Sequence, residues 1–408
     1  MNCRFCNTPL HFEFLDLVNS PPSNSFLSSD QLNEPEIFYP LRVLVCENCF
    51  LVQIDEYQKS SAIFNNDYVY FSSFSSSWLN HAKKYCEEVV KRLSLNQESK
   101  VIEIASNDGY LLQFFLEKNI PVLGIEPTKN TATIAVKKGI ETVTEFFGTV
   151  LAEELTKKGV LADLLIGNNV LAHVPNINDF VAGMKRILTP NGTITMEFPH
   201  LIQMINQNQF DTIYHEHFSY LSLFTVKKIF FQQGLEIYDV DEISTHGGSL
   251  RIYAKHLDDT SKQVSTSVSD LVSKEKLLGV DTLTYYKDFN TNVDQIKIDF
   301  LSFLIEQKKN GKKVVGYGAA AKGNTLLNYC GVKKDLISFV VDANPNKQGK
   351  YLPGSHIPVV SEDLLKQFQP DFVVIFPWNL SAEIMNQLSY IRTWGGRFLI
   401  PIPNVHID

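Results

Sequence analysis

No apolar run in the 408-residue sequence approaches the roughly 20 residues of a membrane span, so no membrane partner is expected. The chain also lacks low-complexity tracts, blocks of like charge and clusters of Lys and Arg. With a formal net charge of -8, these absences argue against nucleic-acid binding, because phosphates require clustered basic side chains. The amino terminus lacks the pattern of a signal peptide, so we expect a cytoplasmic protein.

The composition that remains is typical of a globular protein. The chain is 44% hydrophobic and 20% charged, and its 28 Phe and 16 Tyr suit cores and pockets. Its length exceeds that of one ordinary core, so two or three domains are expected.

Four of the six cysteines form two Cys-x-x-Cys pairs, Cys3 with Cys6 and Cys46 with Cys49. In a reducing compartment, such pairs more often hold metal than form disulfides. Four thiolates in this pattern predict a tetrahedral structural zinc site, closed to substrate. The alternatives are a redox pair and unligated thiols. Because prolines interrupt the segment between the pairs, we expect the metal to hold a small domain together.

Residues 101–109 have the pattern of an apolar strand that runs into a short polar turn before a helix. A second strand over 122–127 ends in Glu126, the usual position for a carboxylate that binds ribose hydroxyls. The pattern alone does not separate a dinucleotide from S-adenosylmethionine. However, the turn lacks the Gly-x-Gly-x-x-Gly that seats a pyrophosphate, so a cofactor without phosphates fits better.

A further strand is predicted over 162–167, a helix over 178–188 and a strand over 192–198. Asn168, Asn169 and His173 follow the first of these strands at its carboxyl end, where ligand sites of α/β folds lie. A lone His is more often structural, but this place on the same rim as Glu126 favours a function.

The segment from Tyr214 to Tyr220, Tyr-His-Glu-His-Phe-Ser-Tyr, contains two imidazoles and a carboxylate. That density of acid and base groups makes it the leading candidate for proton chemistry. The alternative is a polar turn in which His215 and His217 are solvated or structurally satisfied.

A second strand-turn-helix pattern spans residues 313–324. Its three glycines allow a helix N-terminus to receive an anion, and Lys322 adds a charge. A strand over 337–341 then ends at Asp342, which corresponds to Glu126. The alternative is a tight turn without a ligand. We therefore predict an α/β fold, a small N-terminal zinc-binding module followed by two Rossmann-like doubly wound α/β domains. The expected boundaries are 1–75, 76–260 and 261–408.

The order and spacing of these motifs resemble the family of S-adenosylmethionine-dependent sugar C-methyltransferases that act on nucleotide-linked keto-deoxysugars. The resemblance covers nearly the whole chain. Its marks are the two cysteine pairs, Glu103-x-x-Ser106-Asn107-Asp108-Gly109, Tyr214-His215-Glu216-His217 and Gly316-x-Gly318-Ala-Ala-Ala-Lys322-Gly323. One departure is Ala105, where S-adenosylmethionine turns commonly have Gly.

The resemblance implies a zinc module beside the active site, a middle domain for the cofactor and a carboxyl-terminal domain for the nucleotide of the sugar. The residues expected at the cofactor are Glu103, Ala105, Asn107, Gly109, Glu126, Pro127, Asn168 and Asn169. Those expected at the substrate are Tyr70, Gly318, Ala319, Lys322, Asn324 and Asp342. The expected catalytic residues are Tyr68, His173, Tyr214, Glu216 and His217.

Methylation of a sugar carbon requires removal of the proton beside a ketone and stabilisation of the enolate oxygen. We expect His217 to be the base, with Glu216 orienting it or serving as the alternative base. Tyr214 or His173 would donate to the oxyanion. The family resemblance implies a 4-keto-6-deoxysugar on dTDP or GDP, methylated at C-3, for branched-chain deoxysugar biosynthesis.

Two other functions are compatible with parts of the sequence. An O- or N-methyltransferase would use the same cofactor and a base, but no keto group. An oxidoreductase would use the second glycine turn for a dinucleotide, although two nucleoside layers and a zinc knuckle exceed what hydride transfer requires. The oligomeric state is not determined by the sequence, which is compatible with a monomer.

Overall fold

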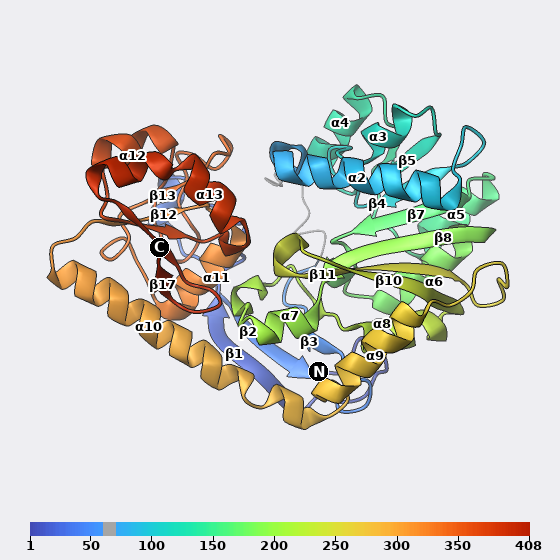
Figure 1. Ribbon diagram of the computed structural model, residues 1–408, viewed down its shortest axis with the longest axis horizontal. Coiled ribbons are helices and arrows are strands. Elements are labelled where there is room, and N and C mark those ends of the chain that lie inside the picture. Colours follow the sequence, from blue (N-terminus) through green and yellow to red (C-terminus); the bar gives the residue numbers. More distant parts are fainter. Residues whose placement is uncertain (60–70) are drawn as a thin grey trace.

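The structure, a computed structural model, describes residues 1–59 and 71–408. Within these residues the chain forms a four-stranded, a seven-stranded and a six-stranded sheet. The two larger sheets are covered by helices and lie on either side of the small one (Figure 1). The predicted α/β fold, with a small N-terminal module and two Rossmann-like layers, is confirmed.

The small sheet joins the two larger domains. Its strands are, in spatial order, β1 (Phe12–Ser20), β2 (Tyr39–Val45), β3 (Val52–Ile54) and β9 (Ser219–Tyr220). Side chains of a strand alternate between its faces. Leu41, Val43 and Val45 accordingly pack into the core of the carboxyl-terminal domain. Leu44 and the adjoining Cys46 pack into the core of the middle domain. Each face of β2 therefore contributes side chains to the core of a neighbouring domain.

The middle domain contains the seven-stranded sheet. Its spatial order is β10 (Leu235–Ile243), β11 (Ser249–His256), β8 (Leu188–Pro199), β7 (Ala162–Asn168), β4 (Val101–Ile104), β5 (Val122–Ile125) and β6 (Thr142–Val143). Strands β8 to β6 are parallel, and β10 and β11 are antiparallel. All four residues of β4 are buried, as a strand with helices on both faces requires.

Two helical layers cover this sheet. One contains α2 (Ser76–Leu93), α3 (Leu112–Leu116) and α4 (Lys129–Lys137). The other contains α5 (Thr149–Lys157), α6 (Ile177–Ile187) and α8 (Leu223–Gln232). Between β8 and β9 lie α7 (Leu201–Asn206) and the 3-10 helix η4 (Phe210–Thr212).

The chain reaches the third sheet through α9 (Thr266–Leu278) and α10 (Phe289–Lys309), which run along one edge of the molecule (Figure 1). The sheet has the order β14 (Val359–Val360), β13 (Val340–Val341), β12 (Val314–Tyr317), β15 (Phe372–Ile375), β16 (Arg397–Ile400) and β17 (His406–Ile407). Its helices are α11 (Ala321–Cys330), α12 (Glu362–Phe368) and α13 (Ser381–Gln387). The strand predicted over 337–341 is limited to its last two residues. No helix of the described chain is long and apolar enough to cross a membrane.

Candidate active site

Glu126 lies at the carboxyl end of β5, on the rim where the cofactor is expected. Its buried carboxylate accepts hydrogen bonds from the backbone N–H groups of Asn107, at 2.9 Å, and Thr128, at 2.8 Å. The Thr128 hydroxyl also donates to it. Burial raises the pKa of Glu126, and the hydrogen bonds oppose that shift. Since a carboxylate has about four acceptor positions, Glu126 can hold the turn and still bind a ribose hydroxyl.

The turn after β4 contains three residues in the left-handed backbone region, Ala105 (φ 57°), Asn107 (φ 49°) and Gly109 (φ 75°). This conformation costs a residue with a Cβ about 1–2 kcal/mol, which explains why related turns commonly have Gly where this chain has Ala105. A Cβ on Gly109 would lie 2.4 Å from Ile140 Cδ1 and 3.3 Å from Ala135 Cβ. Both conformation and packing therefore require Gly109.

We expect Gly109→Ala to weaken S-adenosylmethionine binding about tenfold or more and to destabilise the fold by about 2 kcal/mol, because the new methyl displaces the turn. Calorimetric titration and thermal unfolding measure the two effects. Gly159→Ala is the matched control, since Gly159 has a similar φ of 77° but nothing within 4 Å of an added Cβ. Unchanged affinity in Gly109→Ala, or an equal loss in Gly159→Ala, would contradict this expectation.

Asn168 and Asn169 lie at the carboxyl end of β7. Asn168 is buried, and neither atom of its amide has a hydrogen-bond partner among the described residues. Asn169 has a left-handed φ of 53°, and its N–H donates to the Glu197 carbonyl at 2.8 Å. Leaving a buried polar group unpaired costs about 1–3 kcal/mol, so Asn168 is suited to bind a ligand. With Glu126 on the same rim, these groups fit the ribose and amino acid parts of S-adenosylmethionine.

The segment before α2 and the first turn of that helix cover the rim. The Ser72 N–H donates to Asn107 Oδ1 at 2.9 Å, and the Trp78 ring stacks on Tyr110 with 5.9 Å between centroids. Tyr68 and Tyr70, predicted to be catalytic and substrate-binding, lie outside the described residues.

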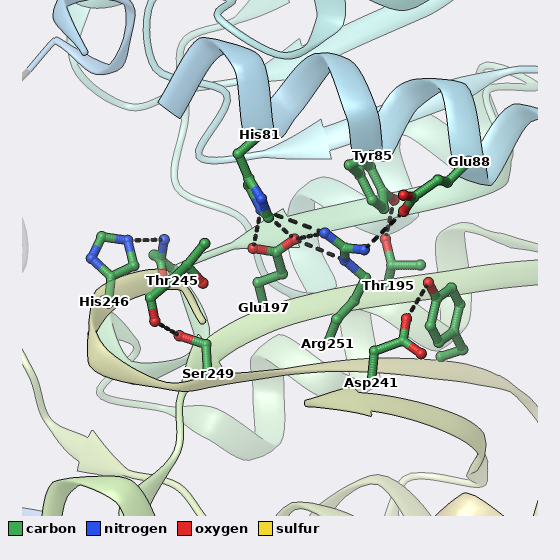
Figure 2. Close-up of polar contacts among 12 residues, drawn as sticks. His81, Tyr85, Glu88, Thr195, Glu197, Asp241, Thr245, His246, Ser249 and Arg251 are labelled. Carbon is green, nitrogen blue, oxygen red and sulfur yellow. Dashed lines mark hydrogen bonds and ion pairs between the residues drawn. The ribbon is translucent and has the colours of Figure 1, made fainter. Parts of the chain in front are cut away.

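Figure 2 shows a buried charge cluster that attaches α2 to the sheet. His81 Nε2 lies 2.9 and 3.1 Å from the two carboxylate oxygens of Glu197, on β8. Arg251, on β11, donates from Nε to Glu197 at 2.8 Å and pairs with Glu88 at 3.7 Å. Burial alone would raise the pKa of Glu197, but the hydrogen bonds and charges of His81 and Arg251 lower it. The cluster fixes α2 over β8 and β11.

The segment from Tyr214 to Tyr220 is fixed between two domains. Its end forms β9, in which Tyr220 pairs with Val52 of the N-terminal sheet. The Phe218 N–H donates to the Ala172 carbonyl at 2.7 Å, in the 3-10 helix η3 (Leu171–His173) that follows β7. The segment is therefore held at the carboxyl end of the middle sheet, beside the cofactor rim.

Three of the predicted catalytic residues meet there. The ring of His217 lies 4.1 Å from that of Tyr214 and 4.6 Å from that of His173, between centroids. Nδ1 of His217 lies 2.8 Å from the Thr212 carbonyl. A carbonyl only accepts, so Nδ1 carries hydrogen and Nε2 of the neutral ring is an acceptor. Burial, which disfavours the charged imidazolium, lowers the pKa of His217 well below its ordinary value.

Glu216 was expected to orient His217 or to be the alternative base. In the structure the Thr212 carbonyl contacts the His217 ring, and Asn24 Nδ2 donates to Glu216 Oε1 at 2.6 Å. Burial raises the pKa of Glu216 to about 7, and the Asn24 hydrogen bond opposes the shift. Glu216 therefore stays a candidate base. Asn24 comes from the N-terminal module and was not found by sequence reasoning.

Lys322 lies in the first turn of α11, against the middle domain. Its Nζ donates to Asn379 Oδ1 at 2.9 Å and lies 4.2 Å from the Trp378 ring centroid. Trp378 Nε1 in turn donates to Asp211 Oδ2 at 2.7 Å, and Asp211 belongs to η4. Burial lowers the pKa of Lys322 to about 8, opposed by the Asp211 charge. A cation is therefore placed between the carboxyl-terminal domain and the segment that carries His217.

The turn after β12 uses its glycines for packing. A Cβ on Gly318 (φ 87°) would lie 2.4 Å from Pro377 Cδ, and one on Gly316 would lie 2.5 Å from Phe376. The Ala319 N–H donates to Asp342 Oδ2 at 2.8 Å. This N–H is therefore not available to bind a phosphate.

Asn324 is a further polar residue of this helix. Its side chain is fully buried, and neither amide atom has a hydrogen-bond partner in the described part of the chain. The next residue, Thr325, donates from its hydroxyl to the Ile213 carbonyl at 2.9 Å, directly before Tyr214. Lys322 and Asn324 are thus the groups of α11 that remain for a ligand.

The four predicted zinc ligands meet in the N-terminal module. The sulfur atoms of Cys3, Cys6, Cys46 and Cys49 all lie within 4.8 Å of one another, with 3.5 Å between Cys3 and Cys49. A tetrahedral zinc with Zn–S bonds of about 2.3 Å requires sulfur atoms about 3.8 Å apart. Gln53 donates to Cys3 Sγ at 3.2 Å and supports the cluster from β3. The cluster fits a structural zinc ion.

We expect Cys46→Ser to lose the bound zinc and to lower the melting temperature, because Cys46 also packs into the middle-domain core. Elemental analysis of the purified protein measures the zinc content. Cys86→Ser removes another buried cysteine and should keep one zinc per chain. Equal zinc contents of Cys46→Ser and the wild type would refute the assignment.

Three protein families match successive parts of the chain. Residues 3–64 match a zinc binding domain, residues 78–240 a methyltransferase domain, and residues 244–403 a C-methyltransferase C-terminal domain. Similar solved structures include the PH0226 protein of Pyrococcus horikoshii, at 13% identity and a TM-score of 0.39, over 46% of this chain and 95% of that one. Another is the magnesium protoporphyrin IX methyltransferase of Synechocystis with bound S-adenosylhomocysteine, at 14% identity and a TM-score of 0.34, over 43% and 81%.

Among curated proteins, the C-methyltransferase NovU of Streptomyces niveus is 32% identical over 408 residues, which cover 99% of this chain and 96% of that protein. The match therefore spans the zinc module and both α/β domains. The chain belongs to the family of S-adenosylmethionine-dependent C-methyltransferases that combine a zinc-binding domain, a methyltransferase domain and a C-methyltransferase C-terminal domain.

Proposed function

We propose that the protein methylates C-3 of a nucleotide-linked 4-keto-6-deoxysugar, beside the keto group, in the biosynthesis of a branched-chain deoxysugar. The observation that carries this proposal is the His217 ring, whose Nδ1 is held by the Thr212 carbonyl while Nε2 is left to accept a proton. An acceptor nitrogen in a buried site is what removal of a carbon-bound proton requires.

In this mechanism His217 Nε2 takes the proton from C-3, and the electrons of the C–H bond form an enolate with the keto group. Because its pKa is lowered, His217 is neutral near pH 7 and ready to accept. When bound, S-adenosylmethionine supplies an electrophilic methyl group. That methyl would pass to the enolate carbon, with S-adenosylhomocysteine as the leaving group, and His217 returns the proton to solvent. Glu216, with a pKa of about 7, is the alternative base.

The aromatic neighbours of His217 are suited to position the sugar. Tyr214 carries a hydroxyl donor and lies against one side of the His217 ring. His173 packs edge-on against the same ring, and burial lowers its pKa to about 4, so it is neutral. A neutral donor beside the keto oxygen stabilises the developing enolate and typically lowers the activation free energy by about 3–4 kcal/mol.

The nucleotide is assigned to the carboxyl-terminal domain. Lys322 supplies a positive charge for the diphosphate, and Asn324 supplies a buried amide without a partner among the described residues. The name of the relative NovU specifies a C-methyltransferase, which supports carbon rather than oxygen or nitrogen as the methyl acceptor.

Solvent exchange tests this reaction and separates it from the second candidate, O- or N-methylation of a sugar. The protein is incubated in deuterated water with a dTDP-4-keto-6-deoxysugar, with S-adenosylhomocysteine filling the cofactor site. We expect deuterium at C-3, read by NMR separately from C-5. An O- or N-methyltransferase would leave C-3 unlabelled while still consuming S-adenosylmethionine on its own acceptor.

A further inference from the structure

His246 lies in a strained turn between β10 and β11. It has a left-handed φ of 55°, and it is followed by Gly247 and Gly248, with φ of 89° and 114°. A Cβ on Gly247 would lie 2.4 Å from the Trp378 ring, and one on Gly248 would lie 2.6 Å from Gln203 Cγ. A His in this backbone region costs about 1–2 kcal/mol, and such strain persists where the surrounding structure holds it.

The turn places the His246 ring against the cofactor rim and the helix that covers it. Asn169 Nδ2 lies 3.1 Å from His246 Nε2, and the Trp78 ring lies 5.2 Å away between centroids. Figure 2 shows His246 beside the cluster of His81, Glu197 and Arg251. His246 therefore shares its surroundings with both Asn169 of the cofactor rim and Trp78 of α2.

The other side of the turn faces the part of the site assigned to the sugar nucleotide. Gly247 packs on Trp378, and the Lys322 ammonium lies over the same ring, 4.2 Å from its centroid. Trp378 therefore contacts both the turn that carries His246 and the Lys322 side chain. His246 thus lies between the cofactor rim and the cation assigned to the diphosphate, which is where the proposed function places the sugar ring.

The hydrogen bond with Asn169 also determines what the ring can do. The amide nitrogen Nδ2 donates, so His246 Nε2 accepts and Nδ1 carries the hydrogen. Among the described residues, none accepts a hydrogen bond from Nδ1. Burial lowers the pKa of His246 to about 4, with a smaller effect of Lys322, so the ring is a neutral donor near pH 7.

We propose that His246 is a further catalytic residue, whose Nδ1–H donates a hydrogen bond to the keto oxygen of the sugar as the enolate forms. This assignment rests on the proposed function. When the C-3 proton moves to His217, negative charge collects on the keto oxygen, and a donor already in place needs no reorganisation. The glycine turn and the Asn169 contact hold the donor in that place.

Two substitutions of His246 distinguish the loss of the hydrogen-bond donor from a loss of the fold. His246→Gly removes the side chain and also relieves the strained backbone, since Gly tolerates a positive φ. His246→Asn is tolerated at the same φ and places an amide N–H near the position of Nδ1. C-3 exchange with S-adenosylhomocysteine bound, turnover and cofactor affinity are measured for both variants.

We expect exchange and turnover to fall about 10²–10³-fold in His246→Gly, with unchanged cofactor affinity, because one oxyanion donor is lost. His246→Asn should stay within about tenfold of the wild type, and added imidazole should partly restore exchange in His246→Gly. Wild-type exchange in His246→Gly, or lost turnover with intact exchange, would overturn the assignment. Absence of exchange in the wild-type protein would instead reject the proposed function.

Discussion

We expect His217→Asn to abolish C-3 exchange and methyl transfer, with a loss of about 10²–10⁴-fold or more. The Asn amide can still donate to the Thr212 carbonyl, as Nδ1 of His217 does at 2.8 Å, but no acceptor remains at the position of Nε2. The substitution therefore removes the proposed base and keeps the local hydrogen bond. Exchange is followed by NMR in deuterated water with S-adenosylhomocysteine bound.

His215→Gln is the matched control for His217→Asn. His215 lies two residues away, but its Nε2 contacts the Pro40 carbonyl at 3.1 Å, and its ring packs among Tyr39 and Tyr57 of the N-terminal module. We expect His215→Gln to retain exchange. Full exchange in His217→Asn together with its loss in Glu216→Gln would make Glu216, with its pKa of about 7, the base.

Lys322→Met should raise the KM for the nucleotide sugar about 10–100-fold, because a charge-assisted hydrogen bond contributes about 1.5–3 kcal/mol. Affinity for S-adenosylmethionine should not change, since the contacts of Lys322 are with Asn379 and Trp378 of the carboxyl-terminal domain. Initial rates at varied sugar concentration and calorimetric titration of the cofactor separate the two effects.

The pH dependence of KM provides an independent check. Burial lowers the pKa of Lys322 to about 8, so the side chain is charged below that pH and neutral above it. The KM of the wild type should therefore rise as the pH passes 8, whereas that of Lys322→Met should not follow this rise. Lys312→Met removes an exposed lysine paired with Asp371 and should resemble the wild type. An equal KM of Lys322→Met and wild type at neutral pH would remove Lys322 from the substrate site.

The parts of the site that the sequence predicts well are those made by residues close together in the chain. The spacing of the cysteine pairs predicts the zinc cluster, because two short knuckles each need only one tight turn. The order of strand, polar turn and helix over 101–109 similarly places Asn107 and Gly109 on the rim, and the following strand places Glu126 beside them.

The contacts that the sequence does not predict connect residues far apart in the chain. Asn24 and Glu216 are separated by 192 residues, and they meet only because β9 joins the N-terminal sheet. His81 and Glu197 are separated by 116 residues and are brought together by the packing of α2 on β8. Arg251, a charged residue within the largely apolar segment 249–254, is the signal that could have indicated this cluster.

The glycines of the turn after β12 have a role that the sequence pattern does not reveal. Their pattern predicts backbone left free for an anion, but Gly316 and Gly318 each leave space for a neighbour, Phe376 or Pro377. A glycine required for packing and a glycine required for a ligand have the same letter in the sequence. Only the neighbouring side chains distinguish them, and these follow β15, far along the chain from the turn.

Mass spectrometry of turnover mixtures tests the central claim most directly. The protein is incubated with S-adenosylmethionine and a panel of dTDP- and GDP-4-keto-6-deoxysugars, and the products are also analysed by NMR. We expect one sugar to gain a single methyl on carbon beside the keto group, with an equal amount of S-adenosylhomocysteine. A methyl on oxygen or nitrogen, or no turnover of any sugar by protein that binds the cofactor, would contradict the proposed function.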